Sequence, residues 1–195
     1  IERLVGWNHV LDKTSTAATI FEYWFLHLQR LAYAPKVPEA QRATFRAFDP
    51  RRVIQWMTAP DASSGEHKVK PDAARDRILV EALELAVTDL RKVYGDKWAD
   101  IPWGQIHTAR FTHPLAGSPA TRDLFAVPAV PKSGDAYTLL ASSSATESGA
   151  DQTSGASYAF VFDVKDWDNS TGLNAPGQSA QPLSPHYGDL APLWG

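Results

Sequence analysis

Serine hydroxyls are the most direct source of chemistry in this chain, because a serine attacks a carbonyl once a base takes its proton. No serine lies in a Gly-x-Ser-x-Gly or Ser-x-x-Lys pattern. Ser179 follows Gly177 and Gln178, but Pro182 and Pro185 exclude the helix that a nucleophile elbow requires. We therefore interpret Ser179 as a structural residue.

The histidines are the next candidates, since imidazole serves both as a general base and as a metal ligand. A zinc site on a helix would need two histidines about four residues apart. His107 and His113 are six apart and Pro114 follows, so the spacing predicts hydrogen-bonded histidines and no metal site. The six histidines are His9, His27, His67, His107, His113 and His186.

A third candidate is the acidic segment that contains Asp163, Asp166 and Asp168, followed by Asn169. Carboxylates at this spacing resemble a calcium loop, but an EF-hand also needs a central glycine and a distant glutamate, and both are missing. The segment therefore predicts a solvated turn after a buried strand.

The elements that must position these residues differ between the two halves of the chain. The first half, 1–100, has apolar residues at the three-and-four spacing of buried helix faces, with caps and prolines at the expected ends. The predicted helices run from a cap at Thr14 or Ser15 to about Ala34, from Pro38 to Phe45, from Asp49-Pro50 to Met57, and from Asp72 to Tyr94 with Gly95 as C-cap.

The second half, 101–195, is rich in proline, glycine and serine and contains short runs of strand-forming residues. Residues 158–162 are apolar on both faces, which predicts a strand buried in a layered structure. Residues 142–154 lack large apolar residues and predict a mobile surface loop. Helices followed by strands indicate an α+β fold in one unit, 1–195. The predicted strands are Leu124 to Val127, Tyr137 to Ala141, and Tyr158 to Val164.

Composition excludes several classes of function. A net charge of −3 gives no basic field for nucleic acid. No apolar run is long enough to span a membrane. The absence of cysteine excludes disulfides and thiolate metal sites, and it fits an exported bacterial protein.

Several segments along the chain carry a family resemblance together. They are Trp7-Asn8, 15–18 (STAA), 23–24 (YW), 103–115 (WGQIHTARFTHPL), 133–138 (SGDAYT), 155–158 (GASY) with Asp163, and 175–187 (APGQSAQPLSPHY) with Asp189 and Leu193-Trp194. In this order they resemble the C-terminal portion of the β chain in the penicillin acylase family of Ntn hydrolases. The resemblance covers nearly all of the 195 residues and is closest to the penicillin amidase branch.

The resemblance implies an αββα sandwich, in which two antiparallel sheets lie between helical layers. It also implies a precursor that cuts itself into α and β chains. The new N-terminal serine of the β chain would attack the amide of a small N-acyl substrate, with its own α-amine as base. The remaining α and β segments would then be partners, and the protein would be periplasmic or secreted.

The resemblance places the chemistry outside this chain. Because the chain begins at Ile1, the nucleophilic serine, the oxyanion asparagine and any calcium ligands are expected in segments that precede it. No cofactor is therefore expected in this chain, and the chain alone is expected to be inactive. Ala180 stands where the family usually has glycine, and Ser133 replaces the first glycine of a Gly-Gly-Asp segment.

Four residues are the candidates for a catalytic or structural role: Asp163, from the resemblance, and Gln178, His186 and Asp189, in the polar C-terminal segment. Asp163 aligns near a carboxylate that supports a catalytic histidine in cephalosporin acylases, which makes it the candidate supporting residue. Gln178, His186 and Asp189 are expected to tie the C-terminal loops to the sheets through buried hydrogen bonds.

Two alternatives stay open. The chain could come from an acyl-homoserine lactone or cephalosporin-type acylase, or it could be a non-catalytic structural or assembly domain. An independent domain should cover the 158–162 strand and the helix face at Trp24 and Phe25 within itself, whereas a portion of a larger enzyme should leave an apolar patch bare.

Overall fold

The computed structural model describes residues 2–42, 49–58, 73–144 and 151–195. Its internal contacts form two compact units. The helical unit comprises Thr19–Asp100. The discontinuous unit comprises Ile1–Ala18 together with Ile101–Gly195.

The helical unit is built on two long helices, most of α2 (Thr16–Tyr33) and all of α5 (Ala73–Tyr94). The predicted start of α2 is confirmed, since the Ser15 hydroxyl accepts a hydrogen bond from the Ala18 N–H at 3.1 Å. The predicted end of α5 is also confirmed, since Gly95 has a φ of 61° and stops the helix. The shorter elements of this unit are η1 (Ala34–Lys36), α3 (Glu39–Arg42), α4 (Pro50–Thr58) and η2 (Gly95–Asp100).

The core of the helical unit joins α2, α4 and α5. Leu28, Ala32, Val53 and Ala82 are buried together, and the half-buried Trp24 and Phe25 pack against them. The Trp24 indole N–H also donates to the Leu79 carbonyl at 3.0 Å. The Trp24–Phe25 face of α2 is therefore at least partly covered within this unit.

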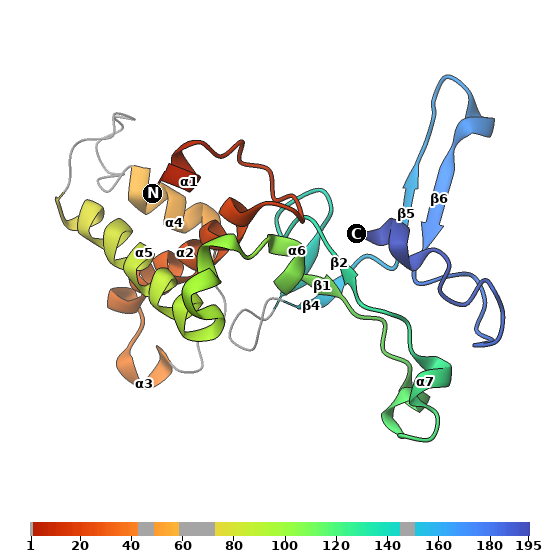
Figure 1. Cartoon of the computed structure of the whole chain (residues 1–195). Coiled ribbons are helices and arrows are strands. Elements are labelled where there is room, and N and C mark those ends of the chain that lie inside the picture. The colour runs from red at the N-terminus through yellow and green to blue at the C-terminus, as the bar shows by residue number, and fades with distance from the viewer. Residues whose placement is uncertain (1, 43–48, 59–72, 145–150) are drawn as a thin grey trace. The chain divides into compact units, whose positions relative to one another are not determined.

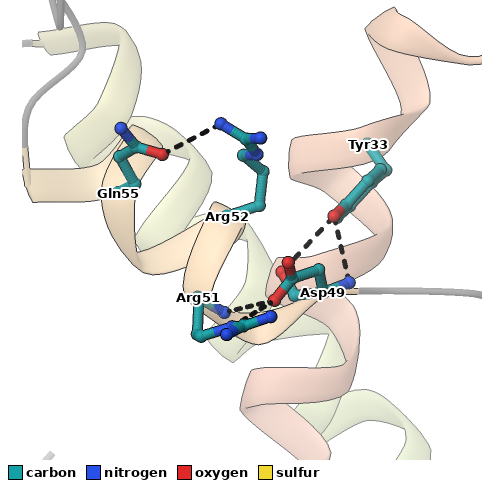
Figure 2. A network of polar contacts seen from close by, with 5 residues as sticks. All are labelled: Tyr33, Asp49, Arg51, Arg52 and Gln55. Carbon is teal, nitrogen blue, oxygen red and sulfur yellow. Dashed lines mark hydrogen bonds and ion pairs between the residues drawn. The ribbon is translucent and has the colours of Figure 1, made fainter.

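The start of α4 is fixed by Asp49, as predicted (Figure 2). The Asp49 carboxylate accepts hydrogen bonds from the Arg51 N–H at 3.0 Å and from the Arg51 guanidinium at 3.3 Å. The Tyr33 hydroxyl lies 3.0 Å from the Asp49 N–H and 3.3 Å from its carbonyl. Tyr33 thereby ties the end of α2 to the cap of α4. The predicted continuation from Pro38 to Phe45 lies partly outside the described residues.

The discontinuous unit contains three two-stranded antiparallel sheets among its described residues (Figure 1). The pairs are β1 (Thr108–Ala109) with β2 (Val130–Pro131), β3 (Ser142–Ser144) with β4 (Gln152–Gly155), and β5 (Tyr158–Val161) with β6 (Thr171–Asn174). Its helical elements are α1 (Glu2–Val5), α6 (Trp103–Ile106), η3 (Pro114–Gly117), α7 (Arg122–Phe125), η4 (Trp167–Asn169) and η5 (Ala191–Trp194).

Two predicted strands are wrong. Leu124 to Val127 begins inside α7, because backbone N–H groups there donate to the Ser118 and Thr121 carbonyls. Tyr137 to Ala141 is a turn region, in which the Asp135 carboxylate accepts from the Tyr137 N–H at 2.8 Å. Short polar side chains that bond nearby backbone override strand propensity at this point.

The loop predicted for 142–154 is wrong for its described part, which contains β3 and most of β4. The two strands contain only serine, threonine, glutamine and glycine, so they pair without apolar side chains. The Thr153 hydroxyl donates across the pair to the Ser143 carbonyl at 3.2 Å. Residues 145–150 of that prediction lie outside the described residues. The strand predicted from Tyr158 is found, but it ends at Val161 and is exposed along its length.

The mixture of helices and small antiparallel sheets confirms the α+β class. The αββα sandwich is not confirmed, because the strands of the described residues form separate pairs and no larger sheet. None of the described helices is long and apolar enough to cross a membrane.

Candidate functional site

The discontinuous unit contains a buried cluster formed by Trp103, His107 and Ser142. The Trp103 ring stacks on His107 with 4.6 Å between centroids and an interplanar angle of 11°. His107 Nε2 lies 2.7 Å from the Ser142 hydroxyl oxygen. Both residues are inaccessible, with relative exposures of 0% for His107 and 1% for Ser142.

This hydroxyl–imidazole pair has the distance used in nucleophilic catalysis, but no substrate can reach it. The role of the pair is therefore structural, because it joins the end of α6 to the start of β3. Sequence reasoning missed the pair because its members are 35 residues apart and share no motif.

Asp151 forms a second polar link, between β4 and the β1 segment. Its carboxylate accepts from the Thr108 hydroxyl at 2.5 Å and from the Arg110 guanidinium at 2.6 Å. Burial raises the pKa of Asp151, but the hydrogen bonds from Thr108 and Arg110 outweigh it and hold the pKa below its ordinary value.

Lys132 is the one lysine among the fully buried side chains of the described residues, with 1% exposure. Its ammonium group donates to the Trp194 carbonyl at 2.9 Å and lies 5.2 Å from the Trp194 ring centre. Burial, aided by the charge of Lys13, lowers the pKa of Lys132. No carboxylate among the described residues forms an ion pair with it.

An apolar hollow of about 310 Å³ opens elsewhere in the same unit. It lies where the 103–115 and 175–187 segments meet, so two segments that carry the family resemblance are neighbours in space. The residues that line it are Phe111, Thr112, His113, Val127, Pro176, Ser179, Ala180 and Tyr187.

Three of the polar side chains that line this hollow, His113, Ser179 and Tyr187, make local hydrogen bonds. His113 Nδ1 accepts from the Leu115 N–H at 3.1 Å, so the neutral ring carries its proton on Nε2. The Ser179 hydroxyl oxygen accepts from the Gln181 N–H at 3.1 Å. The Tyr187 hydroxyl donates to the Phe125 carbonyl at 3.1 Å. The hollow is thus suited to an apolar group and holds no serine–base pair among the described residues.

The whole chain, residues 1–195, matches the family model described as penicillin amidase. The chain belongs to the penicillin amidase family. Its relatives include the penicillin acylase 2 proenzyme of Pseudomonas sp. (strain SE83), with 31% identity over 99% of this chain and 25% of the relative. The acyl-homoserine lactone acylase QuiP of Pseudomonas syringae pv. syringae (strain B728a) is 24% identical over 98% of this chain and 24% of the relative. The chain thus spans about a quarter of the length of these relatives.

In this member of the penicillin amidase family, the tail residues Gln178, His186 and Asp189 are exposed. His186 Nδ1 lies 2.9 Å from the Asp189 carboxylate, and the two side chains are 69% and 37% exposed. The buried hydrogen bonds expected of these residues are therefore not found. The close packing in this tail is made by backbone instead: a Cβ on the buried Gly177 would lie 2.8 Å from the Tyr187 carbonyl oxygen.

We expect His186→Ala to lower the free energy of unfolding by less than about 1 kcal/mol, because exposed ion pairs contribute little. Gly177→Ala should lower it by about 1–3 kcal/mol, since its new methyl group would meet backbone oxygens. Thermal unfolding of the two variants checks the order. A larger loss for His186→Ala would show that its pair with Asp189 contributes more than its exposure indicates.

Asp163 lies in the turn between β5 and β6, two residues after the end of β5. Its carboxylate accepts from the Lys165 N–H at 2.9 Å and the Asp166 N–H at 3.1 Å. The Asp166 carboxylate in turn accepts from the Asp168 N–H at 3.2 Å. These contacts form the solvated turn predicted for the acidic segment. No group of three or more metal-ligating side chains occurs among the described residues.

Proposed function

We propose that this chain is the C-terminal portion of the β chain of an amidase that hydrolyses N-acyl amides, of the penicillin acylase type. The nucleophile would be an N-terminal serine on another segment of an autoproteolytic precursor. In this proposal the α segment and the rest of the β segment are the partners of this chain. The chain supplies the framework, and the substrate binds where several segments meet.

The observation that carries this proposal is the family match along the full chain, at about a quarter of the relatives' length. Two structural features support it. The serine–histidine pair found in the discontinuous unit is buried away from substrate. The β5 strand, which an independent domain should cover, is exposed at every residue. Both favour a portion of a larger enzyme over a self-contained domain.

The substrate class is proposed from the relatives. The more similar relative named above is a penicillin acylase, which favours the side-chain amide of penicillin-like antibiotics. The acyl-homoserine lactone acylase match supports a second candidate, the amide of an acylated lactone. We further propose a periplasmic or secreted location, and calcium, if the full enzyme binds it, would have its ligands in other segments.

The first test is the intact mass and N-terminal sequence of every polypeptide that purifies with this chain. We expect a second polypeptide, or an extension of this one, that begins with serine. The same preparation should hydrolyse a phenylacetyl amide, and comparison with a long-chain acyl-homoserine lactone distinguishes the two substrate classes. A single 21.4 kDa species without amidase activity would overturn the proposal.

Asp163 tests whether this chain contributes to catalysis. We propose from the resemblance that its carboxylate supports a histidine beside the nucleophile, although it is engaged in its own turn. Asp163→Asn in the full enzyme should then lower kcat by about 10-fold or more with normal maturation. Asp166→Asn, in the same turn, is the matched control. Unchanged turnover of Asp163→Asn would remove this role.

A further inference from the structure

The apolar hollow of the discontinuous unit has one wall that is fixed by stacking and hydrogen bonding. The His113 ring stacks on Phe125 with 4.4 Å between centroids and an interplanar angle of 14°. The Tyr187 hydroxyl donates to the carbonyl of the same Phe125 at 3.1 Å, so one residue holds two of the side chains that line the hollow. Walls that are fixed in advance lose little conformational entropy when a ligand binds.

The other wall is the 176–190 segment, which backbone hydrogen bonds close on itself. The Ser179 N–H donates to the His186 carbonyl at 3.0 Å, and the Leu190 N–H donates to the Pro176 carbonyl at 3.1 Å. The close packing at Gly177 leaves no space for a side chain there. The hollow is therefore a formed cavity, and its volume of about 310 Å³ lies within the roughly 300–1,000 Å³ of small-molecule sites.

The polar groups that line the hollow leave hydrogen-bond donors free. His113 Nδ1 already accepts from the Leu115 N–H, and the remaining Nε2–H has no acceptor among the described residues. The Ser179 hydroxyl oxygen accepts from the Gln181 N–H, which leaves its hydrogen available to donate. The Thr112 hydroxyl can donate as well as accept. These groups fit a ligand that carries an acceptor, such as a carbonyl oxygen.

The surroundings of the hollow favour a ligand without charge. No aspartate, glutamate, lysine or arginine lines it. The Asp189 carboxylate lies beside it, with Oδ1 at 2.9 Å from the position of a Cβ on Gly177, which follows the lining residue Pro176. An anion would lose its water near this carboxylate without gaining a cation. A cation would meet free N–H and O–H donors.

We propose that this hollow binds an uncharged carbonyl compound with a short alkyl or aryl group. The carbonyl oxygen accepts a hydrogen bond from His113 Nε2–H, with the Ser179 hydroxyl as a second donor. The alkyl or aryl group packs against Phe111, Val127 and Ala180, which are among the apolar residues of the lining. The inference goes beyond the proposed function, because it concerns binding alone and no bond is broken.

Ala180→Trp tests the location of the site, because its indole would fill the hollow from an exposed position of the lining. The measurement is a ligand-observed NMR titration of methyl hexyl ketone with the complete product of the gene that encodes this chain. We expect Ala180→Trp to weaken binding at least about 10-fold, because it removes the apolar contacts of the alkyl group. Ala120→Trp, at an exposed alanine outside the lining, should leave binding unchanged. Equal effects of the two variants would overturn the proposal.

Photo-cross-linking gives the location without any variant. A methyl alkyl ketone that carries a diazirine is irradiated with the unmodified protein, and the labelled peptides are identified by mass spectrometry. We expect labels on peptides that contain residues 111–113 or 176–187, and excess methyl hexyl ketone should suppress them. Labels confined to other peptides would overturn the proposal.

Two variants of His113 test its hydrogen bond to the ligand, and both lack the imidazole ring. His113→Gln places an amide N–H near the position of Nε2, whereas His113→Asn reaches only the position of Nδ1 and retains an acceptor for the Leu115 N–H. We expect His113→Asn to weaken ketone binding by about 5–10-fold and His113→Gln to weaken it less. Affinities that are equal in the unmodified protein and both variants would overturn the role of this donor.

Octanoate tests the charge of the ligand, because it has a similar chain with an ionised carboxylate. The affinity of the hollow is the part of binding that Ala180→Trp removes. We expect the hollow to bind methyl hexyl ketone at least about 10-fold more tightly than octanoate, since the carboxylate would lose its hydration beside Asp189. Tighter binding of octanoate would overturn the proposed ligand class. A ketone has no bond that an amidase hydrolyses, so these results do not depend on amidase activity.

Discussion

Trp103→Ala should lower the free energy of unfolding of the discontinuous unit by about 3–5 kcal/mol, the range for truncation of a large buried aromatic. Trp103 is completely buried, stacks on His107, and donates from its indole N–H to the Gly134 carbonyl at 2.9 Å. Its backbone N–H also donates to the Ser15 carbonyl at 3.0 Å, so the residue joins both segments of the unit. A loss of this size is a large part of the 5–15 kcal/mol that stabilises a typical domain.

Two variants separate the contribution of the indole hydrogen bond from that of burial. Trp103→Phe keeps an aromatic ring but leaves the Gly134 carbonyl without its donor, which should lower the free energy of unfolding by about 1–3 kcal/mol. Trp167→Ala removes the same side chain where it is 67% exposed. Denaturant unfolding followed by near-ultraviolet circular dichroism should rank the losses as Trp103→Ala first and Trp167→Ala last. Equal losses for the two alanine variants would show that Trp103 is not the anchor of the unit.

The local elements were predictable where one residue type enforces them. Asp49 caps α4 and Gly95 ends α5, because a carboxylate that accepts a first-turn N–H and a residue at positive φ depend on local backbone alone. The strand at Tyr137 was wrong because the Asp135 side chain bonds the backbone two residues on. Strand propensity reflects the types of residue in a segment. It does not account for a side-chain hydrogen bond to the backbone that favours a turn instead.

The candidate site was less predictable, because its contacts join distant parts of the chain. His107 and Ser142 are 35 residues apart, and Lys132 meets Trp194 after 62 residues. Periodicity over a short window carries no information on such pairs. The family resemblance gave more information on the site, since it identified the two segments that meet at the apolar hollow. It did not predict the exposure of His186, because a resemblance names a residue without its surroundings.

Lys132→Met should abolish a pH dependence of stability that the unmodified protein shows in alkaline solution. Folding lowers the pKa of Lys132 below its ordinary value of 10.5, because burial disfavours the charged form and Lys13 repels it. The folded state therefore binds this proton less readily than the unfolded state does. The resulting penalty is fully present below the folded pKa and disappears as the pH rises from the folded pKa to the unfolded one.

The unmodified protein should consequently gain stability relative to Lys132→Met as the pH rises toward 10.5, by about 1.4 kcal/mol for each unit by which folding lowers the pKa. The difference between the two proteins is the quantity to measure, since burial raises the pKa of Tyr23 and adds an opposite dependence above pH 10 to both.

Lys13→Met is the matched control. It removes the repelling charge but not the burial, so it should reduce the dependence without abolishing it. A constant difference between the unmodified protein and Lys132→Met across this range would mean that the ammonium group is stabilised as well in the fold as in water. The hydrogen bond to the Trp194 carbonyl and the nearby indole ring would then offset the whole effect of burial.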